Sequence, residues 1–423
     1  MTRVRNKAAL TGVFALCCFV IFLVLFSQDV FRKIVENRIK EHTELKVNSE
    51  VYKNWKDPPV PAYLQFYFFN VENKQEILQG GRATVRQQGP YTYKEFRHRA
   101  NVSLFNNSTI SASTQRSFIF EPTMSVGDPR KDVVTTINIP FAINGTDDGE
   151  YLFNTGKDDY MKFTEVMMWN GQESLNWWAS NSCNMINGTD GASFHPLIKK
   201  DEKLYIFASD VCRSFYLMFE KEVEVEGISA YRFVLPKEAF DSDHPSNKEC
   251  CPGGNCPLSG VLNISTCKQG APIFISSPHF YNGDQQLVSD IGGMEPNTEV
   301  HQTYLDIEPM TGIPVRAAKR MQINIHVESV KSVVQTSQMR TMILPVIFMN
   351  EHALIDGKSA AKLKAALYKI NLVTYIPHIF LYIGIVLCLA ALILALVAWR
   401  HNDNKVIYCR NYLCVISLKK LCY

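Results

Sequence analysis

Two long runs of uncharged, mostly apolar residues stand near the two ends of the chain. They cover residues 8–26 and 376–399. A helix of the first run's length would be about 28 Å long, close to the hydrocarbon thickness of a bilayer. Basic residues precede the first run, but no small-residue cleavage site follows it, which favours an uncleaved signal anchor over a cleaved signal peptide. The pattern therefore predicts two transmembrane helices.

Between these runs the hydrophobic pattern changes from helical spacing to short alternating segments. Apolar residues recur at helical spacing over 30–39 and again over 360–370, where Ser359 is a candidate N-cap. Segments typical of strands, bounded by Gly, Pro, Asn and Asp, include 63–69, 223–234 and 322–334. The sequence between the two runs contains no internal repeat. The region predicts one α+β domain that is tied to the membrane at both ends.

The charge distribution predicts how the chain crosses the membrane. The net charge is only +3, which argues against a nucleic-acid binder. Residues 1–7 carry +3 and residues 400–423 carry +4, so the stretch between them carries about −4. Because basic residues flank the cytosolic ends of membrane helices, we expect both termini in the cytosol and residues 27–375 outside it.

Glycosylation sequons agree with an outer location of residues 27–375. Six of them occur, and all lie in that stretch, at Asn101, Asn106, Asn107, Asn144, Asn187 and Asn263. Asn106 and Asn107 overlap, so we expect one of the two to be used. The placement is consistent with an outer domain but does not by itself decide the topology.

The twelve cysteines fall into two equal groups. Six lie in the membrane runs or the C-terminal tail, at Cys17, Cys18, Cys388, Cys409, Cys414 and Cys422. The other six are confined to 85 residues of the outer stretch, at Cys183, Cys212, Cys250, Cys251, Cys256 and Cys267. An even number in an oxidising compartment predicts three disulfides, with the connectivity open. Zinc is disfavoured because no CxxC pair exists.

Residues typical of catalysis are scarce. His195, His244 and His279 each adjoin a proline in turn-like sequence, and we interpret them as surface groups rather than bases. Two pairs of adjacent acids, Asp147 with Asp148 and Asp158 with Asp159, could in principle bind calcium. Their order lacks the pattern of a calcium-binding EF-hand, so we interpret them as solvated loop charges. The sequence predicts neither an enzyme nor a metal or cofactor site.

Several longer motifs resemble those of the class B scavenger receptors. They are 58–61 (PPVP), 65–71 (QFYFFNV), 89–96 (GPYTYKEF), 125–129 (SVGDP), 183–191 (CNMINGTDG), 306–312 (DIEPMTG) and 318–324 (AKRMQIN). The two-span topology is also that of the family. Residues 145–149 (GTDDG), 194–197 (FHPL) and 270–273 (GAPI) are similar to the lysosomal member of the family.

The resemblance implies a fold, partners and a disulfide pattern. It implies a twisted antiparallel β-barrel with a helical cap at the membrane-distal end and an internal lipid tunnel. Family members bind lipids such as cholesterol, lipoproteins or protein cargo, and the lysosomal member escorts lysosomal β-glucosidase, which docks on the cap. By resemblance Cys212 pairs with Cys267, Cys256 pairs with Cys250 or Cys251, and the remaining one of those two reaches Cys183.

Two departures from the family pattern bear on function. Asn138-Ile-Pro140 is followed at once by Phe141-Ala-Ile143 and Asn144-Gly-Thr146, where the family has several amphipathic helices. We therefore expect the apical helix bundle to be largely missing and β-glucosidase escort to be weak or lost. The tail lacks an acidic dileucine signal and offers only a tyrosine-based pattern from Tyr412 to Val415. Such a chain is what an alternatively spliced product would give.

The tail leaves the cellular location open. Cys409, Cys414 and Cys422 are candidates for palmitoylation. A lysosomal or late endosomal membrane is favoured by the resemblance, with the plasma membrane or endoplasmic reticulum as alternatives.

Two other functions stay open: a ligand-blind receptor variant and, less favoured, a two-span ion channel. A homo-oligomer is also open. A channel is disfavoured because the run 376–399 has few polar residues to line a pore.

Overall fold

The structure is a computed structural model that describes residues 2–137, 147–332 and 336–419. Its contacts divide the chain into two compact units. Residues 39–364 form one, which we call the sheet unit, and residues 1–38 with 365–423 form the other, the helix-pair unit. The insertion point of the expected cap helices, Asn138 to Thr146, lies outside the described residues.

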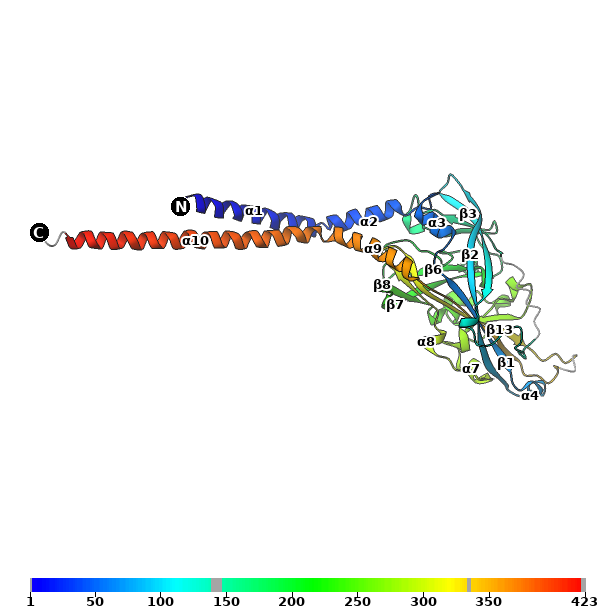
Figure 1. Cartoon of the computed structure of the whole chain (residues 1–423). Coiled ribbons are helices and arrows are strands. Elements are labelled where there is room, and N and C mark those ends of the chain that lie inside the picture. The colour runs from blue at the N-terminus through cyan, green and yellow to red at the C-terminus, as the bar shows by residue number, and fades with distance from the viewer. Residues whose placement is uncertain (1, 138–146, 333–335, 420–423) are drawn as a thin grey trace. The chain divides into compact units, whose positions relative to one another are not determined.

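The sheet unit is built on one large sheet of mostly antiparallel strands (Figure 1). Its strands are β1 Ala62–Val71, β2 Ala83–Leu104, β3 Thr109–Phe120, β4 Asp147–Asn154, β5 Val166–Trp169, β6 Leu204–Ala208, β7 Arg213–Val225, β8 Ile228–Val234, β9 Val261–Asn263, β10 Ile273–Ser276, β11 Ile291–Gly292, β12 Tyr304–Glu308, β13 Ile313–Val327 and β14 Met342–Leu354. Eleven of them follow the order β5-β4-β3-β2-β1-β14-β13-β12-β8-β7-β6. β9 and β10 extend from β13, and the short β11 pairs with β2 in parallel.

A short irregular segment joins the two ends of this strand order. The N–H of Val166 in β5 donates to the carbonyl of Gly188, and the N–H of Phe207 in β6 donates to the carbonyl of Thr189. Gly188 has φ +79°, and a Cβ there would lie 1.9 Å from the carbonyl oxygen of Tyr205, so only glycine fits this approach. The sheet is therefore a nearly closed barrel, as the family resemblance implies.

Helices are short in the sheet unit and long in the helix-pair unit. They are α1 Thr2–Ser27, α2 Val30–His42, α3 Glu50–Lys56, α4 Lys74–Leu78, α5 Asn181–Asn184, α6 Pro245–Lys248, α7 Gln285–Asp290, α8 Thr298–His301, α9 Gly357–Thr374 and α10 Ile376–Lys419. The helices predicted over 30–39 and 360–370 thus lie within α2 and α9. The N-cap of α9 is Asp356 and not Ser359, the predicted candidate. Asp356 Oδ1 accepts hydrogen bonds from the N–H groups of Lys358 and Ser359.

Two of the predicted strands also have different limits. Residues 223–234 are the end of β7, a turn at Glu226 and Gly227, and all of β8. The apolar pattern ran through this turn, which needs positive φ at both residues. β13 ends at Val327, so the predicted strand over 322–334 is too long. The strand predicted over 63–69 lies within β1.

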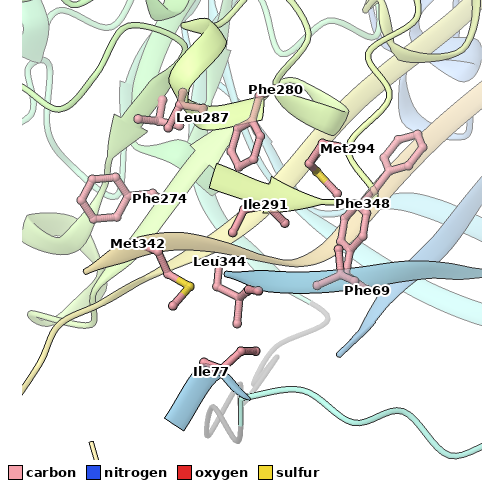
Figure 2. Packing of buried hydrophobic residues seen from close by; sticks show 13 residues of the cluster. Phe69, Ile77, Phe274, Phe280, Leu287, Ile291, Met294, Met342, Leu344 and Phe348 are labelled. Carbon is pink, nitrogen blue, oxygen red and sulfur yellow. The ribbon is translucent and has the colours of Figure 1, made fainter. Parts of the chain in front are cut away.

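The largest buried cluster fills the space between β1, β14 and the elements around β10 (Figure 2). Phe69 from β1 and Phe348 from β14 meet Phe280, Ile291 and Leu344 there, and Phe69, Phe280 and Ile291 are almost fully buried. Burying such side chains contributes about 1.5–3 kcal/mol each. This cluster fixes the register of the long strands, since a one-residue slip would turn the whole apolar face outward.

The helix-pair unit consists mainly of α1 and α10, which run side by side (Figure 1). Phe22 and Phe26 contact His378, whereas Ala15 and Cys18 approach Gly384, so the two helices are antiparallel. Arg3–Ser27 and Ile376–His401 are long and apolar enough to cross a membrane. These spans contain the predicted transmembrane runs, and α10 continues beyond its run to Lys419.

Candidate functional site

Seven charged side chains from six elements form a continuous series of ion pairs, which we call the ion-pair belt. In order they are Asp148 (β4), Arg116 (β3), Glu95 and Arg97 (β2), Glu351 (β14), Lys319 (β13) and Asp210 (η3, Ser209–Val211). The nitrogen–oxygen distance is 3.1 Å from Arg116 to Asp148 and 3.0 Å from Lys319 to Asp210. Arg97 links Glu95 to Glu351 at the centre of the belt.

The two ends of the belt meet, and this places it inside the barrel. Ser209, the neighbour of Asp210, donates from its hydroxyl to Asp148 Oδ1 at 2.6 Å. The series therefore returns to its first residue. Side chains from β4, from β13 and from the segment after β6 can close such a ring only when they point into the barrel that those strands enclose.

The belt residues remain accessible to water although protein surrounds them. Arg97, Glu351 and Lys319 keep 27, 22 and 41% of their side-chain surface exposed. Solvent therefore reaches the middle of the belt.

The pairing keeps the belt charged over a wide pH range. Burial alone would raise the pKa of Glu351, but Arg97, Lys319 and Arg116 lower it to about 2. Lys319 also lowers the pKa of Asp210 against the opposing effect of burial. Burial alone would lower the pKa of Lys319, yet Asp210 and Glu351 hold it above its ordinary value. Removing Lys319 would take away the ion-pair partner that Asp210 has in the belt.

Apolar side chains share the belt's face of the sheet. The strand register places Phe118 opposite Glu95 and Leu64 opposite Glu351. We call the half-buried or exposed apolar side chains on this face the apolar wall. They are Leu64, Phe66, Tyr93, Phe118, Phe120, Met321 and Met349. Tyr93 packs against both Phe66 and Phe120, with ring centroids 5.7 and 5.4 Å away. An apolar wall beside charged groups is suited to an amphipathic molecule.

A second polar group lies in the core, away from the belt. His279 and His301 stack with their ring centroids 4.4 Å apart and their planes 8° from parallel. His279 Nδ1 accepts from the N–H of Glu295, and His301 Nδ1 accepts from the N–H of Asn297. Burial lowers the pKa of His279 to about 4 and, with the charges of His279 and Arg320, that of His301 to about 3. Both rings are therefore neutral near pH 7.

The position of His279 corrects its interpretation as a surface group. It is 7% exposed, and its Nε2 lies 2.7 Å from Gln87 Oε1. His195 and His244 are half-buried: the His195 ring lies 3.3 Å from the Glu202 carboxylate, and His244 is the N-cap of α6. His301 was not singled out from the sequence, because nothing nearby distinguishes it from a surface histidine.

Of the four acidic residues predicted to be solvated loop charges, some are exposed and one is part of the ion-pair belt. Asp148 is not a solvated loop charge: it lies in β4 and joins Arg116, Ser209 and Tyr151. Asp158 and Asp159 are exposed, and Asp159 caps a short 3-10 helix. Asp147 begins β4. Among the residues that the structure describes, no group of acids, histidines and cysteines is arranged to hold a metal.

The six outer cysteines form three disulfides. Cys212 bonds Cys267, Cys183 bonds Cys250, and Cys251 bonds Cys256. Of the two partners left open for Cys256, the structure therefore has Cys251. Vicinal Cys250 and Cys251 extend in different directions, so one short segment is tied both to α5 and to its own following loop.

The sequons that the structure describes lie in the sheet unit. Asn101, Asn106 and Asn107 are exposed near the turn between β2 and β3, and Asn187 and Asn263 are half-exposed. Asn144 lies outside the described residues. The last part of α10 contains the candidate sorting residues Tyr412 and Val415 and the candidate palmitoylation residues Cys409 and Cys414. Cys422 lies outside the described residues.

Comparison with known proteins decides the family. The profile of the CD36 family matches residues 13–143 and 141–395, which is most of the chain. The chain belongs to the CD36 family. The rat protein "Lysosome membrane protein 2" is 42% identical over 88% of this chain and 92% of its own length, and the human protein of that name is 40% identical over the same shares. The pig protein "Scavenger receptor class B member 1" is 30% identical over 91% of this chain and 89% of its own length.

The resemblance to class B scavenger receptors is therefore confirmed, and the relatives are named as receptors or membrane proteins, not as enzymes. The alignment to the rat CD36-family protein runs over 438 residues, more than the 423 of this chain, so the relative has residues without a counterpart here. The two matches to the CD36 family profile meet at residues 141–143. This is the point where the sequence predicts that the cap helices are missing.

Proposed function

We propose that this CD36-family membrane protein binds an amphipathic lipid inside its barrel. The observation that carries the proposal is that solvent-exposed charges of the ion-pair belt and exposed apolar side chains such as Phe118 lie together on one face of the sheet. The charged belt would contact a polar head group, and the aromatic and methionine side chains would contact the hydrocarbon part. Family members bind lipids and lipoproteins, which supports the same ligand class.

Two neighbouring residues of β3 provide a matched test of lipid binding. Phe118 lies on the belt's face and is 40% exposed, whereas Ile119 points to the other face and is 61% exposed. In the purified full chain in detergent, we expect Phe118→Asp to weaken binding of a fluorescent fatty acid or cholesterol analogue at least about tenfold, because it places a charge in the apolar wall.

The control introduces the same charge one residue away. Ile119→Asp is expected to change lipid affinity less than about twofold, because its side chain faces the opposite side of the strand. Equal lipid affinity in the wild-type chain and both variants would reject the barrel interior as the binding site. A wild-type chain that binds no lipid at all would favour the ligand-blind variant instead.

We further propose that the chain has lost the escort of lysosomal β-glucosidase. The break between the two family matches at residues 141–143 supports this, because cargo of the lysosomal relative docks on the helices expected there. A pull-down from cells is expected to recover much less β-glucosidase with this chain than with a relative that has the cap helices. Equal recovery of the enzyme by the two proteins would refute the loss.

For location we propose a lysosomal or late endosomal membrane, with both termini in the cytosol and the sheet unit outside it. The lysosomal relatives and the basic flanks of the two spans support this arrangement. N-glycans are proposed at Asn101, at one of Asn106 and Asn107, and at Asn144, Asn187 and Asn263. In the tail, sorting through Tyr412 to Val415 and palmitoylation of Cys409 and Cys414 are proposals of the same kind.

A further inference from the structure

A buried arginine outside the belt has no acid partner among the described residues. Arg213, the first residue of β7, is only 9% exposed. No carboxylate lies within ion-pair distance of its guanidinium in the part of the chain that the structure describes. By contrast, the comparably buried Arg99 faces Asp190, and Arg232 faces Asp306. A buried cation is normally paired, so Arg213 calls for a different source of negative charge.

A hydrogen bond to a neutral amide does not neutralise the guanidinium. Arg213 Nη2 donates to Asn247 Oδ1 at 2.6 Å. The amide nitrogen of Asn247 donates to the carbonyls of Glu238 and Asp241, which fixes the amide oxygen toward Arg213. A guanidinium has five N–H donors, so four remain without a partner in the described residues. The ring of Phe215 lies 5.7 Å from the guanidinium carbon.

The remaining donors border a pocket that opens to solvent. This Arg213 pocket is a small recess, and apolar side chains such as Phe240, Pro257 and Leu262 line much of it. Its rim includes Cys250 and Cys251, each held by a different disulfide. A rim fixed in this way gives the pocket a preformed shape.

One acid lines the pocket but is engaged elsewhere. Asp241 Oδ1 accepts from the hydroxyl of Ser259 at 3.1 Å and from the N–H of Asp243 at 3.0 Å. It makes no ion pair with Arg213. The pocket therefore combines an unneutralised guanidinium with an apolar lining.

We propose that the Arg213 pocket binds a small oxyanion of the phosphate or carboxylate type, either free in solution or as the head group of an anionic lipid. Arginine is suited to such groups because its planar fork of N–H donors matches two oxygens of one anion. The site is separate from the ion-pair belt and does not depend on lipid binding inside the barrel. Burial lowers the pKa of Arg213 to about 10, which leaves it charged at neutral and acidic pH.

Titration of the purified full chain with inorganic phosphate tests the site. The chain is treated with a glycosidase first, because the sequon residue Asn263 also lines the pocket. Calorimetry is expected to show saturable binding that Arg213→Gln weakens at least about tenfold, as loss of a charge-assisted interaction requires. Arg86→Gln removes the same charge from an exposed arginine paired with Glu72 and is expected to leave the affinity unchanged.

A second variant that is expected to bind phosphate more tightly keeps the test decisive even when Arg213→Gln fails to fold. Asp241→Asn keeps an acceptor for Ser259 and Asp243 but removes a negative charge from the pocket, so phosphate is expected to bind about threefold tighter or better. The proposal is overturned when the wild-type chain shows no saturable binding. It is also overturned when a folded Arg213→Gln variant, with its three disulfides intact, binds phosphate as well as the wild type does.

A second ligand separates the two sources of the anion. Dihexanoyl phosphatidic acid, used below its critical micelle concentration, carries the same phosphate group with short acyl chains. An affinity at least about tenfold above that of phosphate, lost in Arg213→Gln, supports a lipid head group that also uses the apolar lining. Equal affinities, both lost in that variant, support a free anion.

Discussion

Acidification from pH 7 to pH 5 is expected to lower the free energy of unfolding by about 4 kcal/mol through His279 and His301, at about 2 kcal/mol for each ring. Their pKa values in the folded chain are about 4 and about 3, below the ordinary value of 6.5. The unfolded chain therefore binds more protons than the folded chain between those values. Stability is full above about pH 7 and falls as the pH drops through this window.

Geometry explains why the folded chain resists protonation at these rings. Each Nδ1 already accepts a backbone N–H, so a second ring proton would break a buried hydrogen bond. Two charged rings would also repel each other across the 4.4 Å stack. The charged group that acts on His301 from its surroundings is Arg320, which opposes protonation further, whereas Gln87 and Gln322 next to His279 are neutral.

Guanidinium-induced unfolding of the full chain in detergent, followed by tryptophan fluorescence at pH 7 and pH 5, measures this effect. His301→Asn keeps an acceptor near the position of Nδ1 and is expected to halve the loss of stability. His244→Asn makes the same change at the half-buried histidine that caps α6 and is expected to leave the loss of stability unchanged. A pH dependence that His301→Asn does not reduce would contradict the assignment.

Removing the disulfide between Cys212 and Cys267 is expected to cost about 4 kcal/mol of unfolding free energy. The two residues are 55 positions apart, so the bond removes much of the freedom of the unfolded chain. The pair Cys251 and Cys256, only 5 positions apart, is expected to cost about 2 kcal/mol by the same reasoning. Cys→Ala substitution at both members of a pair avoids a free thiol.

The two double variants serve as controls for each other. Both lose one disulfide and two sulfur atoms, and they differ chiefly in the length of the closed loop. Denaturant unfolding in the same detergent gives the two free energies. Equal losses would show that native contacts of the sulfurs, rather than loop closure, set the contribution of the bonds. Peptide mapping of the wild-type chain checks the pairings themselves.

Elements that depend on local pattern could be predicted from the sequence. Spans such as Ile376–His401 need only length and apolarity, which the sequence displays directly. β1 was found because its apolar and turn residues are local. Limits were less accurate: Asp356 and Ser359 are both good N-cap residues, and the choice depends on which side chain reaches the free N–H groups.

The candidate sites could not be found in this way. Glu95 and Glu351 are 256 positions apart in the sequence, and each looks like an ordinary strand residue. They join one belt because β1 lies between β2 and β14 and because the register brings both side chains to the same face. The Arg213 pocket likewise depends on the meeting of β7 with α6 and β9.

The sequence by itself determined the two apolar spans, the grouping of six cysteines between them and the family, and it predicts where the cap helices are missing. These follow from composition and from order along the chain. The tertiary structure decided that Cys251 rather than Cys250 bonds Cys256, that His279 is buried against His301, and that charges from six elements close a ring. The physical reason is that strand register and barrel closure bring distant residues together, and neither can be read from any single segment of the sequence.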